Sequence, residues 1–227
     1  MLFLPFLLLS IAVQAAPSPQ DTEAITLCNQ YSYWSGSPSS NYEGNNNLWG
    51  LSSATSGSQC TYLTSYSSSG LQWHTTWTWA GSPNKVKNVA YSGVRQDVAN
   101  RKTVASIKSM KASVSWQYTG AEKAKANVAF DIFTAADRGH ANTNGDYEVM
   151  IWLARFGNPT PIGTLTRTVS VGGFSWNLYI GMNVNMKVFS FVAPSNISTW
   201  NGNAKDFFEY LRVHREFPVA SQYLLIG

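Results

Sequence analysis

Charge is scarce in this chain. Asp, Glu, Lys and Arg make up only 12% of its 227 residues, about half the share that is usual in globular proteins. The 16 basic residues form no run and the net charge is only +4, so nucleic acid is a poor candidate partner. The sequence also lacks a Gly-x-Ser-x-Gly elbow and a glycine-rich phosphate loop. The chain therefore lacks the marker of the α/β serine hydrolases and a common marker of nucleotide-binding proteins, so both classes are poor candidates.

Histidine and cysteine are scarce too. The three histidines, His74, His140 and His214, are scattered without the spacing of metal ligands, so we expect neither a metal site nor a cofactor. The two cysteines, Cys28 and Cys60, cannot form a zinc site alone. In an oxidising compartment they would form one disulfide. Two free, buried thiols are the alternative.

Only one long apolar run occurs, at the N-terminus from Met1 to Val13, and small residues suited to cleavage follow it. Its length fits the core of a signal peptide and is too short to span a bilayer. We therefore expect residues 1–16 to be a signal peptide, 17–27 a short leader and 28–227 one domain. The mature protein is expected to be secreted, extracellular and monomeric, with no membrane segment.

The rest of the chain breaks into short runs of β-type residues separated by Gly, Ser, Asn and Pro, a pattern typical of a sandwich. Strands are expected at Leu71–Trp79, Ser113–Tyr118, Ala126–Phe133, Thr164–Val171, Phe174–Tyr179 and Met186–Val192. One helical pattern joins Ala204, Phe207, Phe208 and Leu211. That helix should begin near Asn201 or Asn203 and stop before Pro218. The sequence predicts an all-β sandwich of two sheets with one packed α-helix, and strong curvature of one sheet would create a cleft.

The segment 145–153 has the most informative alternation in the chain. One face of this predicted strand is apolar and should lie in the core: Tyr147, Val149, Ile151 and Leu153. The other face sets Glu148 between Met150 and Trp152. Burying a charged group costs free energy unless it is paired, so a carboxylate beside an aromatic wall indicates the nucleophile of a sugar-cleaving site. The alternative is an ordinary polar residue on the solvent face of a strand.

Aromatic rings are abundant, with 9 Trp and 11 Tyr. Flat rings stack on the apolar faces of pyranose sugars, as they do on other flat apolar groups, so a weakly charged surface with many rings suits a hydroxyl-rich partner. Any single tryptophan more readily fills the core between the sheets. At least one or two of the following five are nevertheless expected in a cleft: Trp49, Trp73, Trp77, Trp79 and Trp152.

A second acid, Asp131, lies within a segment that otherwise has the pattern of a buried strand. Two acids on neighbouring strands would couple, so that each changes the pKa of the other. Asp131 is therefore a candidate partner of Glu148. The alternative is that it satisfies a buried hydrogen bond and has no catalytic part. A separate motif, Asn196-Ile197-Ser198, is a glycosylation sequon.

Several motifs occur in the order found in one known family. They are Asn46-Asn47-Leu48-Trp49-Gly50, Trp73-His74-x-x-Trp77-x-Trp79, Asp131-Ile132-Phe133-Thr134-Ala135-Ala136, Asp146-Tyr147-Glu148-Val149-Met150-Ile151-Trp152-Leu153, Pro161-Ile162-Gly163, Phe189-Ser190-Phe191-Val192 and Phe207-Phe208-x-Tyr210-Leu211-Arg212. From about Cys28 to its last residue, the chain closely resembles glycoside hydrolase family 12, the fungal and microbial endo-β-1,4-glucanases and xyloglucanases. The resemblance implies a β-jelly-roll of two stacked antiparallel sheets, with a β-1,4-glucan lying across the concave one.

The resemblance also implies roles for individual residues. Glu148 matches the nucleophile, Asp131 the acid that supports it, and Trp49 a platform that stacks on the sugar of the glycone side. Further residues expected to bind substrate by this resemblance are Asn47, His74, Trp77, Met150, Trp152 and Pro161. Many cellulases of the family have a Trp soon after the first cysteine; this chain has Tyr31 there, which is also expected to bind substrate. A Cys28–Cys60 disulfide fits the family as well.

One departure concerns catalysis. Retaining glycosidases use a second carboxyl as acid and base, which in this family follows the strand that begins like Ser221–Ile226. The sequence ends at Gly227, before that position, so the domain is expected to be incomplete at its C-terminus and to lack this residue. The main hypothesis is a retaining, secreted endo-β-1,4-glucanase acting on cellulose, xyloglucan or mixed-linkage glucan. The alternatives are a glucan-binding or decoy paralogue without activity and a misfolded product.

Overall fold

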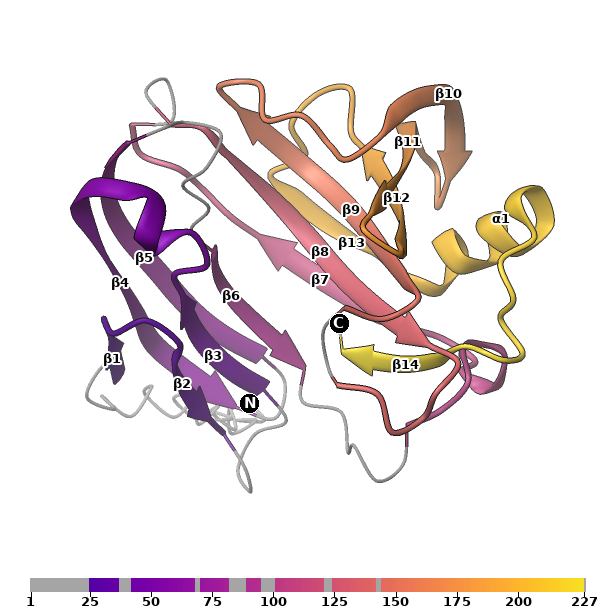
Figure 1. Cartoon of the computed structure of the whole chain (residues 1–227), viewed down its shortest axis with the longest axis horizontal. Coiled ribbons are helices and arrows are strands. Elements are labelled where there is room, and N and C mark those ends of the chain that lie inside the picture. Colours follow the sequence, from indigo (N-terminus) through magenta and orange to yellow (C-terminus); the bar gives the residue numbers. More distant parts are fainter. Residues whose placement is uncertain are drawn as a thin grey trace, which may run out of the picture.

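The computed structural model describes residues 25–36, 42–67, 70–81, 89–94, 101–120, 124–141 and 144–226 (Figure 1). The predicted signal peptide lies outside these residues. The described chain is built mainly of strands, namely β1 (Ile25–Leu27), β2 (Ser32–Ser35), β3 (Tyr42–Asn47), β4 (Ala54–Ser67), β5 (Gly70–Gly81), β6 (Val89–Val94), β7 (Lys111–Ser115), β8 (Ala126–Ala135), β9 (Tyr147–Phe156), β10 (Thr164–Val171), β11 (Phe174–Asn183), β12 (Met186–Val192), β13 (Thr199–Asn203) and β14 (Tyr223–Ile226). One α-helix, α1 (Lys205–Arg215), and the 3-10 turns η1 (Leu51–Ser53) and η3 (Val104–Ser106) accompany them.

The strands pair into four sheets. Their orders are β1-β4-β5, β2-β3-β6, β13-β7 and β10-β11-β12-β9-β8-β14. The expectation of an all-β sandwich is confirmed, but the expectation of purely antiparallel sheets is wrong at one place. Strand β12 runs parallel to β9, with Val188 opposite Glu148. The reason is topological: β10 and β11 lie between these strands in sequence, so they are not joined by a hairpin.

Two layers face each other in the N-terminal half, drawn in indigo and purple in Figure 1. Strand β4 packs on β3, where a side chain added at Gly44 would meet Leu63. Strand β1 pairs with β4 and completes the outer layer. Its residues, Ile25–Leu27, lie within the segment expected to be a leader. Since one face of β3 is covered by β4, its other face, with Asn45 and Asn47, points away from β4.

The main core lies against one face of the six-stranded sheet. Helix α1 contributes Phe207, Phe208 and Leu211, and the β7–β13 ribbon contributes Trp200. These side chains pack with the inward residues of β9 and β12 and with the fully buried Trp176 of β11. Burial of each such side chain stabilises the fold by roughly 1.5–3 kcal/mol. The opposite face of the sheet is therefore the one available for a site.

Helix α1 has the expected length and chemistry. Asp206 lies in its first turn and basic residues in its last turn, which complements the helix dipole. Its N-cap is Ala204 and not Asn201 or Asn203. Asn203 still assists, because its side-chain oxygen accepts a hydrogen bond from the backbone N–H of Lys205 at 3.4 Å. The helix ends at Glu216, whose left-handed backbone stops it before Pro218.

The predicted strands agree closely with the observed ones. Strands β10 and β12 have the predicted bounds, whereas β5, β8 and β11 are longer. Strand β7 ends at Ser115, earlier than the predicted Tyr118, because its partner β13 begins only at Thr199. In the described part of the chain, the structure has no helix long and apolar enough to cross a membrane.

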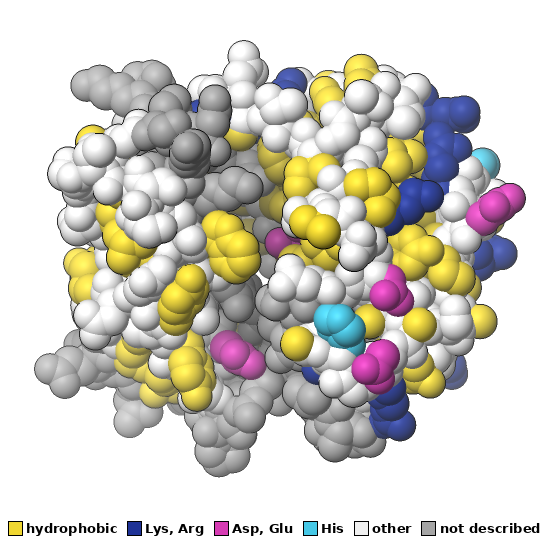
Figure 2. All heavy atoms as spheres, viewed as in Figure 1, with side chains coloured by type: hydrophobic (Ala, Val, Ile, Leu, Met, Phe, Trp, Pro, Cys, Tyr) yellow, Lys and Arg dark blue, Asp and Glu magenta, His cyan; other side chains and the backbone are white. Residues whose placement is uncertain are grey.

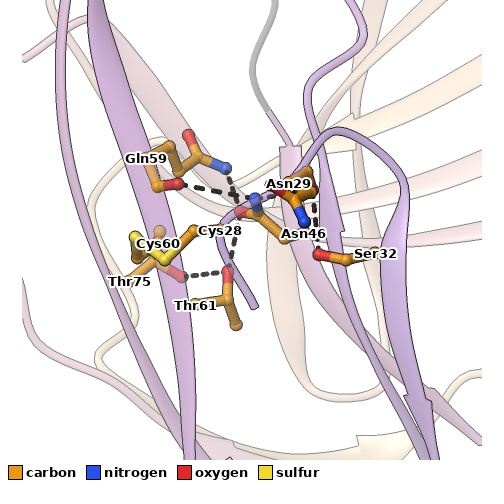
Figure 3. Close-up of a disulfide and its surroundings, with 8 residues drawn as sticks. All are labelled: Cys28, Asn29, Ser32, Asn46, Gln59, Cys60, Thr61 and Thr75. Atoms are coloured by element: carbon orange, nitrogen blue, oxygen red, sulfur yellow. Dashed lines mark hydrogen bonds between the residues drawn. A yellow bond between two sulfur atoms is a disulfide. The ribbon is translucent and has the colours of Figure 1, made fainter. Parts of the chain in front are cut away.

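A disulfide within the outer layer and a buried polar network between the two layers hold the N-terminal half together (Figure 3). Cys28 and Cys60 are bonded, with an S–S distance of 2.02 Å, which confirms the predicted disulfide. Beside it, the side-chain oxygen of Asn46 accepts hydrogen bonds from Gln59 and Thr61, both at 3.2 Å. Asn46 in turn donates to the backbone oxygen of Asn29 at 3.2 Å. The network fixes β3 against β4.

Candidate functional site

Strand β9 has the alternation that the sequence predicts. Val149, Ile151 and Leu153 are fully buried in the core. Glu148 lies on the opposite side with Met150, and its residue exposure is only 7%. We call the face that carries Asp131, Glu148 and Met150 the site face. The alternative that Glu148 is an ordinary solvent-exposed residue is wrong, because this carboxyl is largely buried.

Asp131 and Glu148 meet on this face. On paired strands, Asp131 is opposite Met150 and Phe133 is opposite Glu148, so the two acids are diagonal neighbours. Their side chains form a hydrogen bond. Desolvation by the surrounding protein, and then the Glu148 carboxylate, raise the pKa of Asp131 well above its usual range.

The Asp131 side chain is nevertheless open to solvent, so water screens part of this effect. The combination of an exposed surface and closely surrounding protein atoms is typical of a residue on the floor of a hollow. Because two carboxylates in contact cannot both be ionised at low cost, we assign the shared proton to Asp131. Asp131 then donates a hydrogen bond to an ionised Glu148.

Trp152 lies on the site face but below its surface. Its residue exposure is 6%, and its indole N–H donates to the sulfur of Met150 at 3.4 Å. Met150 is only partly buried. The structure therefore places Trp152 as a support for Met150, while Met150 itself is accessible beside the acid pair.

Exposed rings and partly buried amides lie together on the N-terminal half. Trp49, in the turn between β3 and η1, is 59% exposed. Tyr31 and Tyr33 are exposed near and on β2. Asn47 shares a face of β3 with Asn45, away from the covered Asn46. The sequence-predicted candidates Tyr31, Asn47 and Trp49 thus belong to one region of the surface.

Two other candidates lie in the outer layer. Trp77 is 37% exposed, and its ring meets that of Tyr118 edge-on at a centroid distance of 5.6 Å. His74 stacks on Tyr62 at 4.7 Å. It lies on the side of β5 opposite to Trp73 and Trp77. The structure does not bring His74 together with the Asp131–Glu148 pair, because that side of β5 faces outward.

Pro161 is buried just before β10. The chain that follows it lies tightly against β11, since a side chain at Gly163 would come within 2.0 Å of the backbone oxygen of Ile180. Gly163 also has a positive φ of 92°, which favours glycine. Pro161 and Gly163 therefore fix how β10 enters the sheet, and Pro161 itself presents little surface for binding.

Figure 2 shows the face of the molecule seen in Figure 1. Hydrophobic side chains gather on both halves, on either side of a hollow in which an acidic side chain is visible. The described residues include no group of three or more His, Cys, Asp and Glu side chains that could hold a metal ion. The chemistry of the described site is that of carboxyl groups and rings.

The sequence did not single out three further residues of this surface. Tyr33 is exposed on β2, Leu165 is exposed on β10, and Tyr179 is partly exposed on β11. Alternation within each strand gives the side of each residue, but it does not say which side faces a hollow. That depends on pairing between strands, which the sequence pattern does not contain.

Comparisons with known proteins agree with this picture. The family described as glycosyl hydrolase family 12 matches residues 40–226. "Endoglucanase A" of Aspergillus kawachii is 44% identical over 204 residues, which cover 88% of this chain and 82% of that protein. "Xyloglucan-specific endo-beta-1,4-glucanase A" of Emericella nidulans is 38% identical over 206 residues, 89% of this chain and 82% of that protein. The catalytic domain of Humicola grisea Cel12A, solved with a soaked thio cellotetraose, has a TM-score of 0.83 and 46% identity, and the match covers 89% and 88% of the two chains.

Proposed function

The chain belongs to glycosyl hydrolase family 12 and is a glycoside hydrolase of the endoglucanase class, and we propose that it cleaves β-1,4-glucans by a retaining double displacement. Glu148 is the nucleophile and Asp131 the residue that positions it. Xyloglucan and cellulose share a β-1,4-glucan backbone, so this reaction can cleave either polymer. Two of the related proteins are named for xyloglucan and for endoglucanase activity, which supports the choice of substrate class.

The observation that carries the proposal is the hydrogen bond between Asp131 and Glu148. Asp131 holds the proton, so Glu148 remains ionised although it is largely buried. The hydrogen bond also fixes the orientation of the attacking carboxylate. An ionised, oriented carboxylate on a solvent-accessible face has the properties that a glycosidase nucleophile requires.

In the first step, a Glu148 oxygen bonds to the anomeric carbon while the bond from that carbon to the leaving oxygen breaks. The leaving oxygen must be protonated by a general acid other than Asp131, and we assign no described carboxyl to this step. In the second step, water activated by the same group replaces Glu148 at the anomeric carbon. The acid in a retaining enzyme lies about 5–5.5 Å from the nucleophile. Asp131 is hydrogen-bonded to Glu148, so it is too close for that task and acts on the nucleophile instead.

A second candidate function is glucan binding without hydrolysis. The specific observation in its favour is that two other described carboxyls, those of Asp146 and Glu209, are engaged elsewhere. Asp146 accepts hydrogen bonds from Ala136 and Gln222, and Glu209 pairs with two basic residues of α1. Neither is placed to protonate a leaving group beside Glu148.

We also propose that the protein is secreted. The apolar segment at the N-terminus has the length of a signal peptide, and the Cys28–Cys60 disulfide suits an oxidising compartment. Asn196, in the sequon, is exposed between β12 and β13. An exposed acceptor asparagine is what glycosylation in the secretory pathway needs.

The test is release of reducing sugar from xyloglucan and from carboxymethyl-cellulose. Glu148→Gln keeps the size of the side chain and removes the nucleophile, so we expect the rate to fall by about 10³-fold or more. Glu209→Gln, a change on the surface of α1, serves as the control and should keep full activity. Retained activity in Glu148→Gln would reject the assigned nucleophile. Binding of cellohexaose without hydrolysis by the unmodified chain would favour the second candidate.

A further inference from the structure

A single row of residues crosses the site face from the acid pair to the far edge of the sheet. Five residues are direct partners across successive strands: Asp131 of β8, Met150 of β9, Ser190 of β12, Tyr179 of β11 and Leu165 of β10. Direct partners point to the same side of a sheet. All five side chains therefore lie on the site face.

The spacing of strands gives the scale of this row. Neighbouring strands lie about 4.8 Å apart, so the backbone of Tyr179 is about 10 Å from that of Met150 across the sheet. Leu165 is one strand further, at about 14 Å. This distance is longer than one sugar unit, so the row is long enough to contact several units of a polymer that runs across the strands.

Exposure falls from Asp131, which is open to solvent, to Ser190 and then rises again toward the far edge of the sheet. Ser190 is fully buried, Tyr179 is partly buried and Leu165 is 53% exposed. The backbone under Leu165 is held in place: a bulge follows it, and the Thr166 hydroxyl donates to the backbone oxygen of Leu178 at 2.9 Å. A bulge can redirect a side chain in a sheet. Leu165 is thus an apolar side chain held at the open end of the row.

The row extends away from the N-terminal half. In Figure 1, β10 and β11 lie on the opposite side of β8 and β9 from β3 and η1, between which Trp49 is found. With Trp49 as the platform of the glycone half, as the resemblance implies, the leaving half of the substrate extends toward β11 and β10. The apolar faces of its sugar rings then meet Tyr179 and Leu165.

We propose that Leu165 and Tyr179 form a platform that binds the leaving-group half of a β-1,4-glucan chain, with Leu165 as a residue that sets the preference for long substrates. The proposal rests on the proposed function, because it takes the acid pair as the point of cleavage. Contact of a sugar ring with an aliphatic side chain and a tyrosine ring removes apolar surface from water. Truncation of Leu165 removes the outer part of this contact.

The experiment compares two substrates with Leu165→Ala. Cellohexaose extends sugar units over the platform, whereas the leaving group of 4-nitrophenyl β-cellotrioside ends beside the acid pair. We expect kcat/KM of Leu165→Ala to fall about three- to tenfold on cellohexaose, and clearly less on the nitrophenyl substrate. Leu165→Phe retains an apolar face and should restore the cellohexaose value. Val184→Ala, which truncates an aliphatic residue 87% exposed in the β11–β12 turn, is the matched control.

A second readout keeps this proposal separate from the proposed function. Titration calorimetry of Glu148→Gln with cellohexaose measures binding without chemistry, and Leu165→Ala in that background should weaken it about three- to tenfold. If the unmodified chain hydrolyses neither substrate but this binding difference is found, the proposed function fails and the platform remains. Equal losses on both substrates, or equal affinity with and without the Leu165 side chain, would overturn the platform.

Discussion

Asp131 donates a hydrogen bond to Glu148 across a diagonal of strands β8 and β9. One proton is therefore shared by two carboxyl groups in a region from which water is partly excluded. The folded protein favours the neutral form of Asp131, since both desolvation and the Glu148 charge raise its pKa. In the proposed function the pair supplies the attacking carboxylate, and its raised pKa ties the stability of the fold to pH.

The first prediction concerns that pH dependence. Because the folded pKa of Asp131 is raised, the stability that it contributes is complete at acid pH and is lost as pH rises through the folded value. Asp131→Asn cannot ionise, so its free energy of unfolding should not show this loss, and its advantage over the unmodified chain should grow with pH. Urea unfolding measured across the acid and neutral range tests this.

The variant Asp146→Asn should show the opposite dependence of stability on pH. Hydrogen bonds from Gln222 and Ala136 lower the pKa of Asp146, so its contribution is present at neutral pH and lost as pH falls through the folded value. We expect Asp146→Asn to be less stable at neutral pH and to approach the unmodified chain in acid. Identical pH profiles for both variants would contradict the assignments.

The buried network of Figure 3 gives a second prediction. Asn46→Ala leaves Gln59 and Thr61 without their acceptor and should lower the free energy of unfolding by about 2–4 kcal/mol. Thr75→Ala removes only the contact to Thr61, of 3.1 Å, and should cost about 1 kcal/mol. Chemical denaturation of both variants measures the difference, and equal costs would mean that Asn46 is not the centre of the network.

The disulfide is the subject of a third prediction. Cys28 and Cys60 are 32 residues apart, a separation for which loss of the link should cost roughly 3–4 kcal/mol. The double variant Cys28→Ser, Cys60→Ser should therefore unfold at a lower denaturant concentration. Reductant should bring the unmodified chain to the same midpoint and leave the double variant unchanged. A midpoint of the unmodified chain that does not respond to reductant would contradict this.

Two tryptophans allow a matched comparison. Trp176 is fully buried and donates to the backbone oxygen of Val171 at 3.1 Å, so Trp176→Ala should lower stability by about 3–5 kcal/mol. Trp49 is exposed, and Trp49→Ala should change stability by less than about 0.5 kcal/mol. In contrast, Trp49→Ala should weaken cellohexaose binding about tenfold. Calorimetry and thermal melting of both variants separate the two roles, and a Trp49→Ala variant with unchanged affinity would remove Trp49 from the site.

Alternation in the sequence predicts individual strands well. The bounds of β10 and β12, the two faces of β9 and the apolar stripe of α1 follow from the spacing of residues that each segment carries. Partners are harder to predict, because they depend on which strands become neighbours. The parallel pairing of β9 with β12 and the row that ends at Leu165 both arise from such pairing.

The tryptophans show that the burial of individual side chains is also hard to predict from the sequence. Trp49 and Trp152 are both apolar rings within motifs that the sequence singles out. One is largely exposed and the other supports Met150 from below. Composition cannot separate these roles, because burial is decided by the layer that covers each strand.

The parallel pairing of β9 with β12 has a consequence for the order in which the protein forms. Strands β8 and β9 are adjacent in sequence, so the hairpin that joins Asp131 to Glu148 can close as soon as both have left the ribosome. The neighbour on the other side of β9 is synthesised much later, after β10 and β11. Contacts between distant segments form slowly, so we expect the hairpin that carries the acid pair to form before β12 pairs with β9.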